Sequence, residues 1–141
     1  MGMTITTHTE TLRTKGQDDC VDVTGAVQGA VSRSKVRQGL ATVFVTGSTA
    51  GVTTVEYEPG LVQDLEELFD RIAPAEARYH HEERWHDGNG HSHVRASLLG
   101  PSLVVPFAKG KLLLGTWQQV ILIDFDNRPR TRELVVTLMG E

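Results

Sequence analysis

Residues 103–139 read LVVPFAKGKLLLGTWQQVILIDFDNRPRTRELVVTLM, and this C-terminal stretch decides the fold. It contains runs rich in β-branched and large apolar residues at 103–105, 111–114, 117–125 and 134–139. Residues typical of turns separate these runs, namely Lys109-Gly110, Gly115 and Asn127-Arg128-Pro129. Short apolar runs bounded by turn residues are typical of strands. The stretch therefore predicts a strand at each of the four runs.

The region upstream adds further strand-like segments. The first dozen residues partly alternate between apolar and polar side chains and contain many threonines, which is typical of a strand. Residues 40–45 and 52–57 are β-branched and aromatic, and the small residues 47–51 between them predict a tight loop. Strands are therefore expected near the N-terminus and on both sides of this loop.

The first predicted helix begins near Thr24, a good N-cap residue, and runs to about Arg37. Gly39 lies just past its expected end, where glycine commonly stops a helix. One face of this helix carries Val27, Ala30, Val31 and Ser34. We expect that face to be buried and the opposite face to meet solvent.

The strongest helical pattern covers residues 61–72, between Pro59-Gly60 and Pro74. Its apolar residues recur every three or four positions, at Leu61, Val62, Leu65, Leu68, Phe69 and Ile72. We expect Leu65, Leu68 and Phe69 to pack against the sheet. A further short helix is expected from Gly90 to Leu99, with Asn89 as its N-cap and Gly100-Pro101 as its stop.

These elements place the chain in the α/β class, of the α+β type. A length of 141 residues suits one domain, and no repeat or linker divides the chain. The prediction is a single β-rich domain over residues 1–141, with a mixed, mostly antiparallel sheet and a few helices packed on it.

Charge and composition narrow the possible partners and location. The net charge of −4 provides no overall positive field for nucleic acid, so a nucleic-acid partner is not expected. No apolar run approaches ~20 residues, so the chain is not expected to cross a membrane. The N-terminus lacks the pattern of a secretory signal, and Cys20, the single cysteine, has no internal disulfide partner. A cytoplasmic location is expected.

Histidines are concentrated in one polar stretch. His81, His86, His91 and His93 lie within thirteen residues, next to His80 and together with Asp87 and Asn89. Imidazole combined with carboxylate is the donor set of many divalent-metal sites. The alternative is a solvated loop that carries incidental histidines. The cofactor prediction is a divalent metal ion, zinc or magnesium.

On the expected helix from Gly90 to Leu99, the side chains of His91 and His93 point in different directions. Residues two apart on an α-helix point roughly 200° away from each other, so His91 and His93 would not chelate one ion together. In an extended stretch the same two residues would share a face. On the helix, His91 falls on the side of Val94 and Leu98, where a half-buried histidine is the simpler interpretation.

Other candidate residues lie outside this stretch. Glu56 ends an apolar strand, either facing a cleft or at a solvent-exposed edge. Arg128 and Arg130 flank Pro129, and guanidinium groups held in this way suit phosphate; they could equally pair with Asp124 and Asp126. Residues 46–51, which include Ser48 and Thr49, are small and rich in hydroxyls, so their backbone could approach an anion closely.

The order of several motifs closely resembles the YjbQ-like family. The motifs are residues 47–56, Tyr79-His80-His81, residues 87–93, Leu99-Gly100-Pro101-Ser102, Leu114-Gly115-Thr116-Trp117-Gln118 and residues 126–130. The resemblance runs from about Gly39 to the C-terminus, with a looser match before it. It implies a small cytosolic protein with a β-rich α/β fold that forms a homotrimer.

The resemblance also implies an activity and a set of site residues. Members of the family are regarded as secondary thiamine-phosphate synthases, which join a hydroxymethylpyrimidine diphosphate to a thiazole phosphate and release pyrophosphate. The histidines of the family motif correspond to His81 and His93, and its strand-end glutamate corresponds to Glu56. His91 falls where the motif is looser. Many relatives carry a histidine where this chain has Gly47.

These observations give three functional hypotheses. The first is the transferase, in which Arg128, Arg130 and a divalent cation held by His81, His93 or Glu56 stabilise the leaving pyrophosphate. Its catalytic residues would be Glu56, Asp87 and Asn89, and Ser48 and Thr49 would help to bind phosphate. The second is a metal-dependent hydrolase with Glu56 or Asp87 as general base. The third is a non-catalytic trimeric protein that binds a small phosphorylated metabolite.

Overall fold

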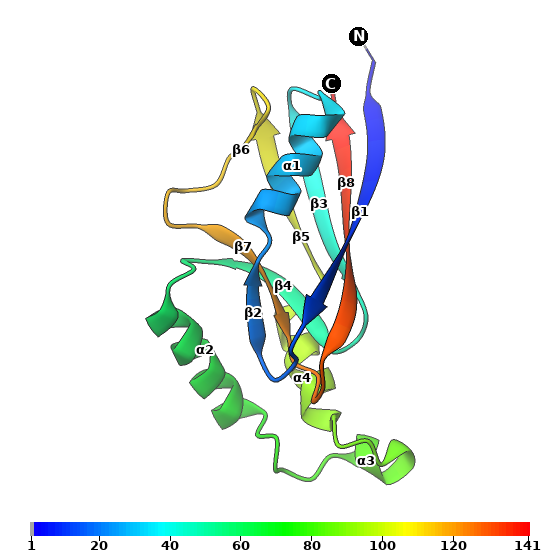
Figure 1. Cartoon of the computed structure of the whole chain (residues 1–141), viewed down its shortest axis with the longest axis vertical. Helices are drawn as coiled ribbons and strands as arrows, with labels where there is room; N and C mark the ends of the chain where they lie inside the picture. Colours follow the sequence, from blue (N-terminus) through cyan, green and yellow to red (C-terminus); the bar gives the residue numbers. More distant parts are fainter. Residues whose placement is uncertain (1) are drawn as a thin grey trace.

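Residues 2–141, the part of the chain that the computed structural model describes, form eight strands and four helices (Figure 1). The strands are β1 (Thr4–Thr14), β2 (Asp19–Asp22), β3 (Gly39–Thr46), β4 (Ala50–Val55), β5 (Ser102–Ala108), β6 (Lys111–Leu112), β7 (Gln119–Asp124) and β8 (Arg130–Gly140). The helices are α1 (Thr24–Ser34), α2 (Pro59–Ile72), α3 (His80–Trp85) and α4 (Gly90–Leu99). None of these helices is long and apolar enough to cross a membrane.

The strands form two sheets in which all the pairings are antiparallel. One sheet has the order β1-β8-β3-β5-β6 and the other the order β2-β7-β4. The predicted β-rich α+β domain is confirmed, but its strands are divided between two sheets instead of one. The division follows from the path of the chain, which passes from one sheet to the other at six connections, all except that between β5 and β6.

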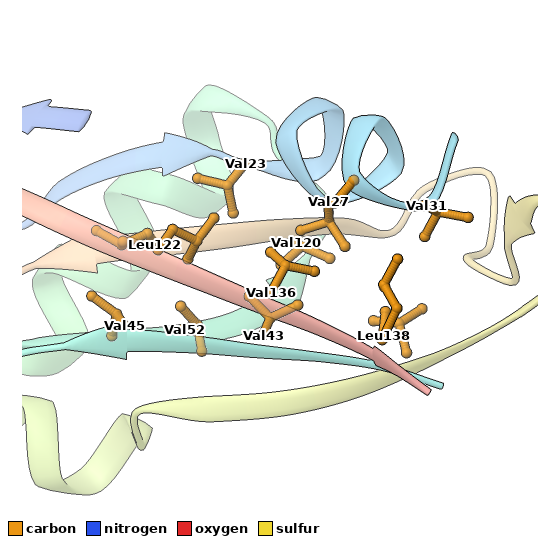
Figure 2. Close-up of a cluster of buried hydrophobic side chains, with 14 of the residues drawn as sticks. Val23, Val27, Val31, Val43, Val45, Val52, Val120, Leu122, Val136 and Leu138 are labelled. Carbon is orange, nitrogen blue, oxygen red and sulfur yellow. The ribbon is translucent and has the colours of Figure 1, made fainter. Parts of the chain in front are cut away.

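The core lies between the two sheets and under α1. Alternate residues of β3 and β8 point inward, which buries Val43 and Val45 on one strand and Val136 and Leu138 on the other. Figure 2 shows Val27 and Val31 of α1, with Val120 and Leu122 of β7, among the side chains of this cluster. The period-two pattern of the sequence therefore reports the buried face of the larger sheet correctly.

Helix α1 buries the predicted face but is shorter than predicted. Val27, Ala30 and Val31 are all buried. The helix ends at Ser34 because Lys35 adopts a left-handed conformation with φ 61°. Gly39 does not cap it: this residue begins β3, and a Cβ there would lie 2.1 Å from the carbonyl oxygen of Met139. A glycine is thus required at position 39 because β3 packs closely against β8 there, and not because α1 ends there.

Helix α2 forms as predicted, but its apolar stripe packs only in part. The Glu58 carboxylate accepts hydrogen bonds from the backbone N–H groups of Gly60 and Leu61, which fixes its first turn. Phe69 is buried against Phe125, with ring centroids 4.8 Å apart. Leu65 is half-buried.

The expected packing of Leu68 against the sheet is wrong. Leu68 is 39% exposed, and Ile72 at the end of the same helix is 53% exposed. Figure 1 shows the helix to one side of the three-stranded sheet, and its residues in the cluster around Ile121 and Ile123 of β7 are Phe69 and Leu65. An apolar stripe therefore predicts an apolar neighbour, but not that the neighbour lies in the same chain.

Helix α4 has the predicted bounds but a different buried face. Arg95 is buried, whereas Val94 and Leu98 are 40% and 61% exposed. The predicted burial on the Val94 and Leu98 side is therefore wrong, because a buried ion pair orients the helix more strongly than two apolar residues. Asn89 occupies the N-cap position, but its side chain makes no capping hydrogen bond. Strand β2 and helix α3 lack a strong apolar period, and neither was predicted.

Candidate functional site

The turn between α3 and α4 brings two of the histidines together. The Glu82 carboxylate of α3 accepts a hydrogen bond of 2.5 Å from the backbone N–H of Gly90, the first residue of α4. Gly90 is required here because a Cβ would lie 2.5 Å from the Cβ of Tyr79. This contact places His81 against His93, with ring centroids 4.3 Å apart and planes inclined by 40°. The structure thus places the two histidines that the family motif indicates side by side.

The histidine pair has an unsatisfied nitrogen and a carboxylate beside it. The Nδ1 atom of His81 is buried and has no hydrogen-bond partner among residues 2–141. The nearest acid is Asp87, whose Oδ1 lies 3.5 Å from that nitrogen. Burial lowers the pKa of His93, and the neighbouring His81 lowers it further. His93 therefore favours the neutral imidazole, the form that binds metal.

His91 lies on the opposite side of α4, as the helix geometry predicts. It is 8% exposed, and its Nδ1 also has no hydrogen-bond partner in the described chain. Burial and then the positive charge of Arg95 lower its pKa. The structure therefore separates His91 from the pair formed by His81 and His93. The remaining histidines of the stretch, His80 and His86, are exposed.

The donor atoms near the pair suit a divalent cation such as zinc, since they are two imidazoles and a carboxylate. Within residues 2–141, however, no three histidine, cysteine, aspartate or glutamate side chains are arranged to hold one ion. One chain therefore offers the two-histidine part of a site. Any further ligand has to be water, a substrate or a residue of another subunit.

Asp126 connects the histidine turn to the C-terminal strands. Its Oδ1 accepts a hydrogen bond of 3.3 Å from the Asn89 amide, which in its opposite orientation donates to Asp87 at 2.9 Å. Burial opposes ionisation of Asp126, yet hydrogen bonds from Asn127, Asn89 and Thr49, and the charge of Arg130, hold its pKa below the usual range. Asp126 is therefore a buried, ionised carboxylate.

Next to Asp126 lies a buried ion pair that the sequence analysis missed. Arg132 donates to both oxygens of Asp124, with Nε–Oδ2 and Nη2–Oδ1 distances of 2.6 and 2.8 Å. Thr14 donates to the same carboxylate, and Thr49 accepts a hydrogen bond from Arg132 and donates one to Asp126. Thr49 is therefore held inside this network and is not free for phosphate, while Ser48 is exposed.

The absence of a side chain at position 47 is explained by the same network. Gly47 has φ 128°, which disfavours other residues, and a Cβ there would lie 2.6 Å from Nη1 of Arg132. A histidine at this position would collide with the guanidinium group in its present place. The glycine thus leaves room for the bidentate pair between Arg132 and Asp124, and this chain has no imidazole at that point.

The two predicted phosphate-binding arginines do share a surface hollow. Arg128 is exposed, and Arg130 lies 3.2 Å from the Asp126 carboxylate. The hollow has a volume of about 470 Å³ and is also lined by Arg13 and Thr131. Arg13 was not singled out in the sequence, because it comes from β1 and meets the other arginines only through the pairing of β1 with β8.

Glu56 is not brought to the histidine pair. It is exposed and follows the last residue of β4, whereas Thr49, beside Asp126, precedes the first. At about 3.3 Å per residue these two ends of the strand are about 20 Å apart. The predicted grouping of Glu56 with Asp87, Asn89 and the histidines is therefore wrong within one chain.

Cys20 has no feature of a reactive thiol. It is half-buried in β2, next to Asp19. Burial and then the charges of Asp19 and Asp22 raise its pKa to about 11, so the thiol stays protonated near neutral pH.

Acidification is expected to destabilise the fold through His91 and His93. Both have pKa values below the ~6.5 of an unfolded histidine, so between these values the unfolded chain binds more protons. Stability is then fully present above about pH 6.5 and falls as the pH is lowered below this value, through the lower pKa values of the folded state. Urea unfolding at a series of pH values would measure this, and His93→Gln should flatten the dependence.

His80→Gln is the matched control, because the His80 side chain is 97% exposed. It should leave the pH dependence of the unfolding midpoint unchanged. A wild-type midpoint that rises on acidification through this window would contradict the prediction.

Comparison with known sequences gives one consistent match. The profile of the family described as UPF0047 protein YjbQ-like matches residues 8–141. A UPF0047 protein of Archaeoglobus fulgidus is 37% identical over 126 residues, which cover 89% of this chain and 95% of that protein. A UPF0047 protein of Methanothermobacter thermautotrophicus is 35% identical, over 99% of this chain and 95% of its own length.

Solved structures agree with these sequence matches. A YbjQ-like protein of Sulfolobus solfataricus superposes with a TM-score of 0.94 at 31% identity, covering 99% of this chain and 100% of that chain. A YjbQ/UPF0047 protein of Clostridium acetobutylicum gives a TM-score of 0.85 at 36% identity, covering 93% and 98%. The likeness extends over the whole fold, including the turn that carries the histidine pair.

Proposed function

The chain belongs to the YjbQ-like UPF0047 family, and from the site described above we propose that it is a metal-assisted transferase of the thiamine-phosphate-synthase type. The reaction would join a hydroxymethylpyrimidine diphosphate to a thiazole phosphate and release pyrophosphate. One observation carries the proposal: Asp126 and Asn127 join the histidine turn to the arginine hollow, because the Asn127 amide donates to the carbonyl oxygen of Asp87 at 2.7 Å and the Asp126 carboxylate contacts Arg130.

A diphosphate leaving group needs positive charge on its oxygens as the bond to carbon breaks. Arg128 and Arg130 would supply part of this charge from the hollow. His81 and His93 would hold a divalent cation, which supplies further charge stabilisation when it is bound. Asp87 and Asn89 lie beside the histidines and would position them, and Asp126 would keep Arg130 in place while one face of its guanidinium remains open.

We further propose a cytoplasmic homotrimer as the working form. The outer face of the five-stranded sheet exposes Leu40, Phe44 and Val104, and α2 exposes Leu68 and Ile72. Apolar surface of this extent is typical of contact between subunits. Self-association would also explain the incomplete metal site and the distant Glu56, if that carboxylate reaches the histidines of a neighbouring subunit.

A hydrolase is the second candidate, and Asp87 favours it. Its carboxylate is exposed and lies 3.5 Å from His81, so it is placed to accept a proton from water activated by a cation at the histidine pair. In this reading the same arginines would bind the phosphate of the substrate. A non-catalytic trimer would use them for binding alone.

The proposal is tested with purified protein loaded with zinc or magnesium and given both phosphorylated precursors. The transferase predicts thiamine phosphate and pyrophosphate in equal amounts. Arg130→Gln is expected to lower the rate on the order of 10²–10³-fold, because one charge-stabilising contact is lost. Arg33→Gln, on α1, is the control and should keep full activity.

The products separate the three hypotheses. Inorganic phosphate without the joined product would indicate the hydrolase. Saturable binding of the precursors without any product would indicate the metabolite-binding protein. Either result would overturn the transferase.

A further inference from the structure

Arg132 of β8 has hydrogen-bond donors that the network around Asp124 does not use. Its Nε and Nη2 donate to Asp124, and Nη2 also donates to Thr49. Its Nη1 carries two further N–H groups, and this nitrogen donates to no acceptor within residues 2–141. The side chain is only 4% exposed. One nitrogen of a buried guanidinium group is therefore without an acceptor.

Gly47 leaves an open position beside this nitrogen, which we call the Gly47 notch. A Cβ built on Gly47 would lie 2.6 Å from Nη1 and 3.7 Å from Cζ of Arg132. Apart from the chain neighbours of Gly47, no other atom of the described chain lies within 4 Å of that point. The distance of 2.6 Å is too short for a carbon atom, but it is close to the ~2.7–2.9 Å between a charged N–H donor and an anionic oxygen. The notch therefore suits an oxygen atom of an anion.

The notch can be reached from solvent. The connection from β3 to β4 passes the first residues of β8, where Thr46 pairs with Glu133 (Figure 1). Gly47 and Ser48 in this connection are exposed. The buried side-chain atoms of residues 2–141 that lack a hydrogen bond belong to three histidines, and Nη1 of Arg132 is not one of them. An incoming anion can therefore contact Nη1 from the side of Gly47.

The connection around Gly47 offers further donors. The backbone N–H groups of Gly47 and Ser48 donate to no backbone acceptor in the part of the chain that the structure describes. Successive free N–H groups in a turn are typical of anion-binding concavities. Ser48 adds an exposed hydroxyl group, and residues 46–51 contain no acidic side chain. An anion with several oxygens could thus be held by more than one donor.

The charges next to the notch do not repel an anion. Arg132 is paired with Asp124 at 2.6 Å, and Arg130 is paired with Asp126 at 3.2 Å, so these four side chains have no net charge. Asp124 accepts hydrogen bonds on the edge of the guanidinium group formed by Nε and Nη2. The notch lies at Nη1, so an anion bound there would not meet the carboxylate directly.

We propose that the Gly47 notch binds an oxygen of a small oxyanion of the phosphate type, with Nη1 of Arg132 as its principal donor. A metal cation is a poorer match, because the groups at the notch are donors. The notch is separate from the arginine hollow, whose lining includes neither Gly47, Ser48 nor Arg132. The proposal does not depend on the transferase reaction or on a cation at the histidine pair.

The test titrates inorganic phosphate into the full chain at constant ionic strength, with chloride as the balancing anion. Chemical shifts of the backbone amides and of the arginine side-chain nitrogens report where phosphate binds. Phosphate is expected to shift the guanidinium signals of Arg132 and the amides of Gly47 and Ser48 along one saturable curve, in the millimolar range. A titration without a saturable shift at Arg132 would overturn the proposal.

A double variant distinguishes the notch from the arginine hollow. Arg13→Gln combined with Arg128→Gln removes two of the charges that line the hollow. The phosphate curve at Arg132, Gly47 and Ser48 should stay unchanged in this variant. Loss of these shifts would assign the binding to the hollow and would also overturn the proposal.

Gly47→Ala places a methyl group in the notch and should weaken phosphate binding roughly tenfold or more, as expected for the loss of one charge-assisted hydrogen bond. Gly110→Ala is the matched control, because Gly110 also has a positive φ, and a Cβ there would lie 3.1 Å from Nη1 of the exposed Arg37. It should leave the phosphate curve unchanged. An unchanged affinity in folded Gly47→Ala would refute the site. Should Gly47→Ala not fold, the curves of the wild type and of the double variant decide.

Discussion

Replacing Asp124 with alanine is expected to lower the free energy of unfolding by about 3–5 kcal/mol. The carboxylate is completely buried and accepts two hydrogen bonds from Arg132 and one from Thr14. Its removal leaves a guanidinium that is 4% exposed without its principal counter-charge. Chemical denaturation by urea, followed by circular dichroism, would measure the loss.

Two further variants test whether the buried charge is the cause. Glu133→Ala changes the exposed neighbour of Arg132 on β8 and should stay within about 0.5 kcal/mol of wild type. Replacing both partners, with Asp124→Leu and Arg132→Met, should recover much of the loss, because neither charge of the pair is left buried without its partner and Asp126 keeps its contact with Arg130. A double variant less stable than Asp124→Ala would show that packing, not charge, sets the effect.

His81→Ala and His93→Ala are each expected to abolish stoichiometric metal binding while the fold stays intact. The two rings lie 4.3 Å apart on separate helices, so each would provide one ligand that the other cannot replace. His91 is directed to the other side of α4, and His91→Ala should cost 10–100-fold at most, the usual effect of a residue outside the ligand set.

Metal content of the three purified variants after dialysis against zinc is the decisive measurement. Far-ultraviolet circular dichroism serves as the check on folding. The site assignment is wrong if His81→Ala retains its full complement of ion. Equal losses for His91→Ala and His93→Ala would instead show that the two residues cooperate, against the direction of their side chains on α4.

Much of the fold could be predicted, because the strands and helices are determined by patterns of neighbouring residues in the sequence. The period of two in residues 134–139 reports which side of β8 is buried, and the bounds of α4 follow from Asn89 and Gly100. The division into two sheets was not predictable, since it depends on which strand each strand pairs with. The exposure of Leu68 was missed for a related reason: a stripe on a helix does not state what it packs against.

The part of the candidate site whose residues all come from one short segment could be predicted from the sequence. The spacing of His91 and His93 on a helix correctly separates their directions, and the turn at 86–89 returns His81 to His93. The Asp124–Arg132 pair was missed because charged residues were assumed to be exposed. One signal was present in the sequence. Arg132 lies two residues before Leu134, and because side chains alternate between the two faces of a strand, both lie on the buried face of β8.

The pairing of the two ends of the chain also constrains how the protein folds. Strand β8 is the last to be synthesised, yet it lies between β1 and β3 and pairs Gly140 with Thr4. Contacts so distant in sequence form slowly, because a long loop has to be closed before they stabilise anything. The edges of β1 and β3 that pair with β8 therefore have no partner in this chain until β8 is synthesised. Escape from aggregation in that interval depends on chaperones or on rapid closure of the sheet after release.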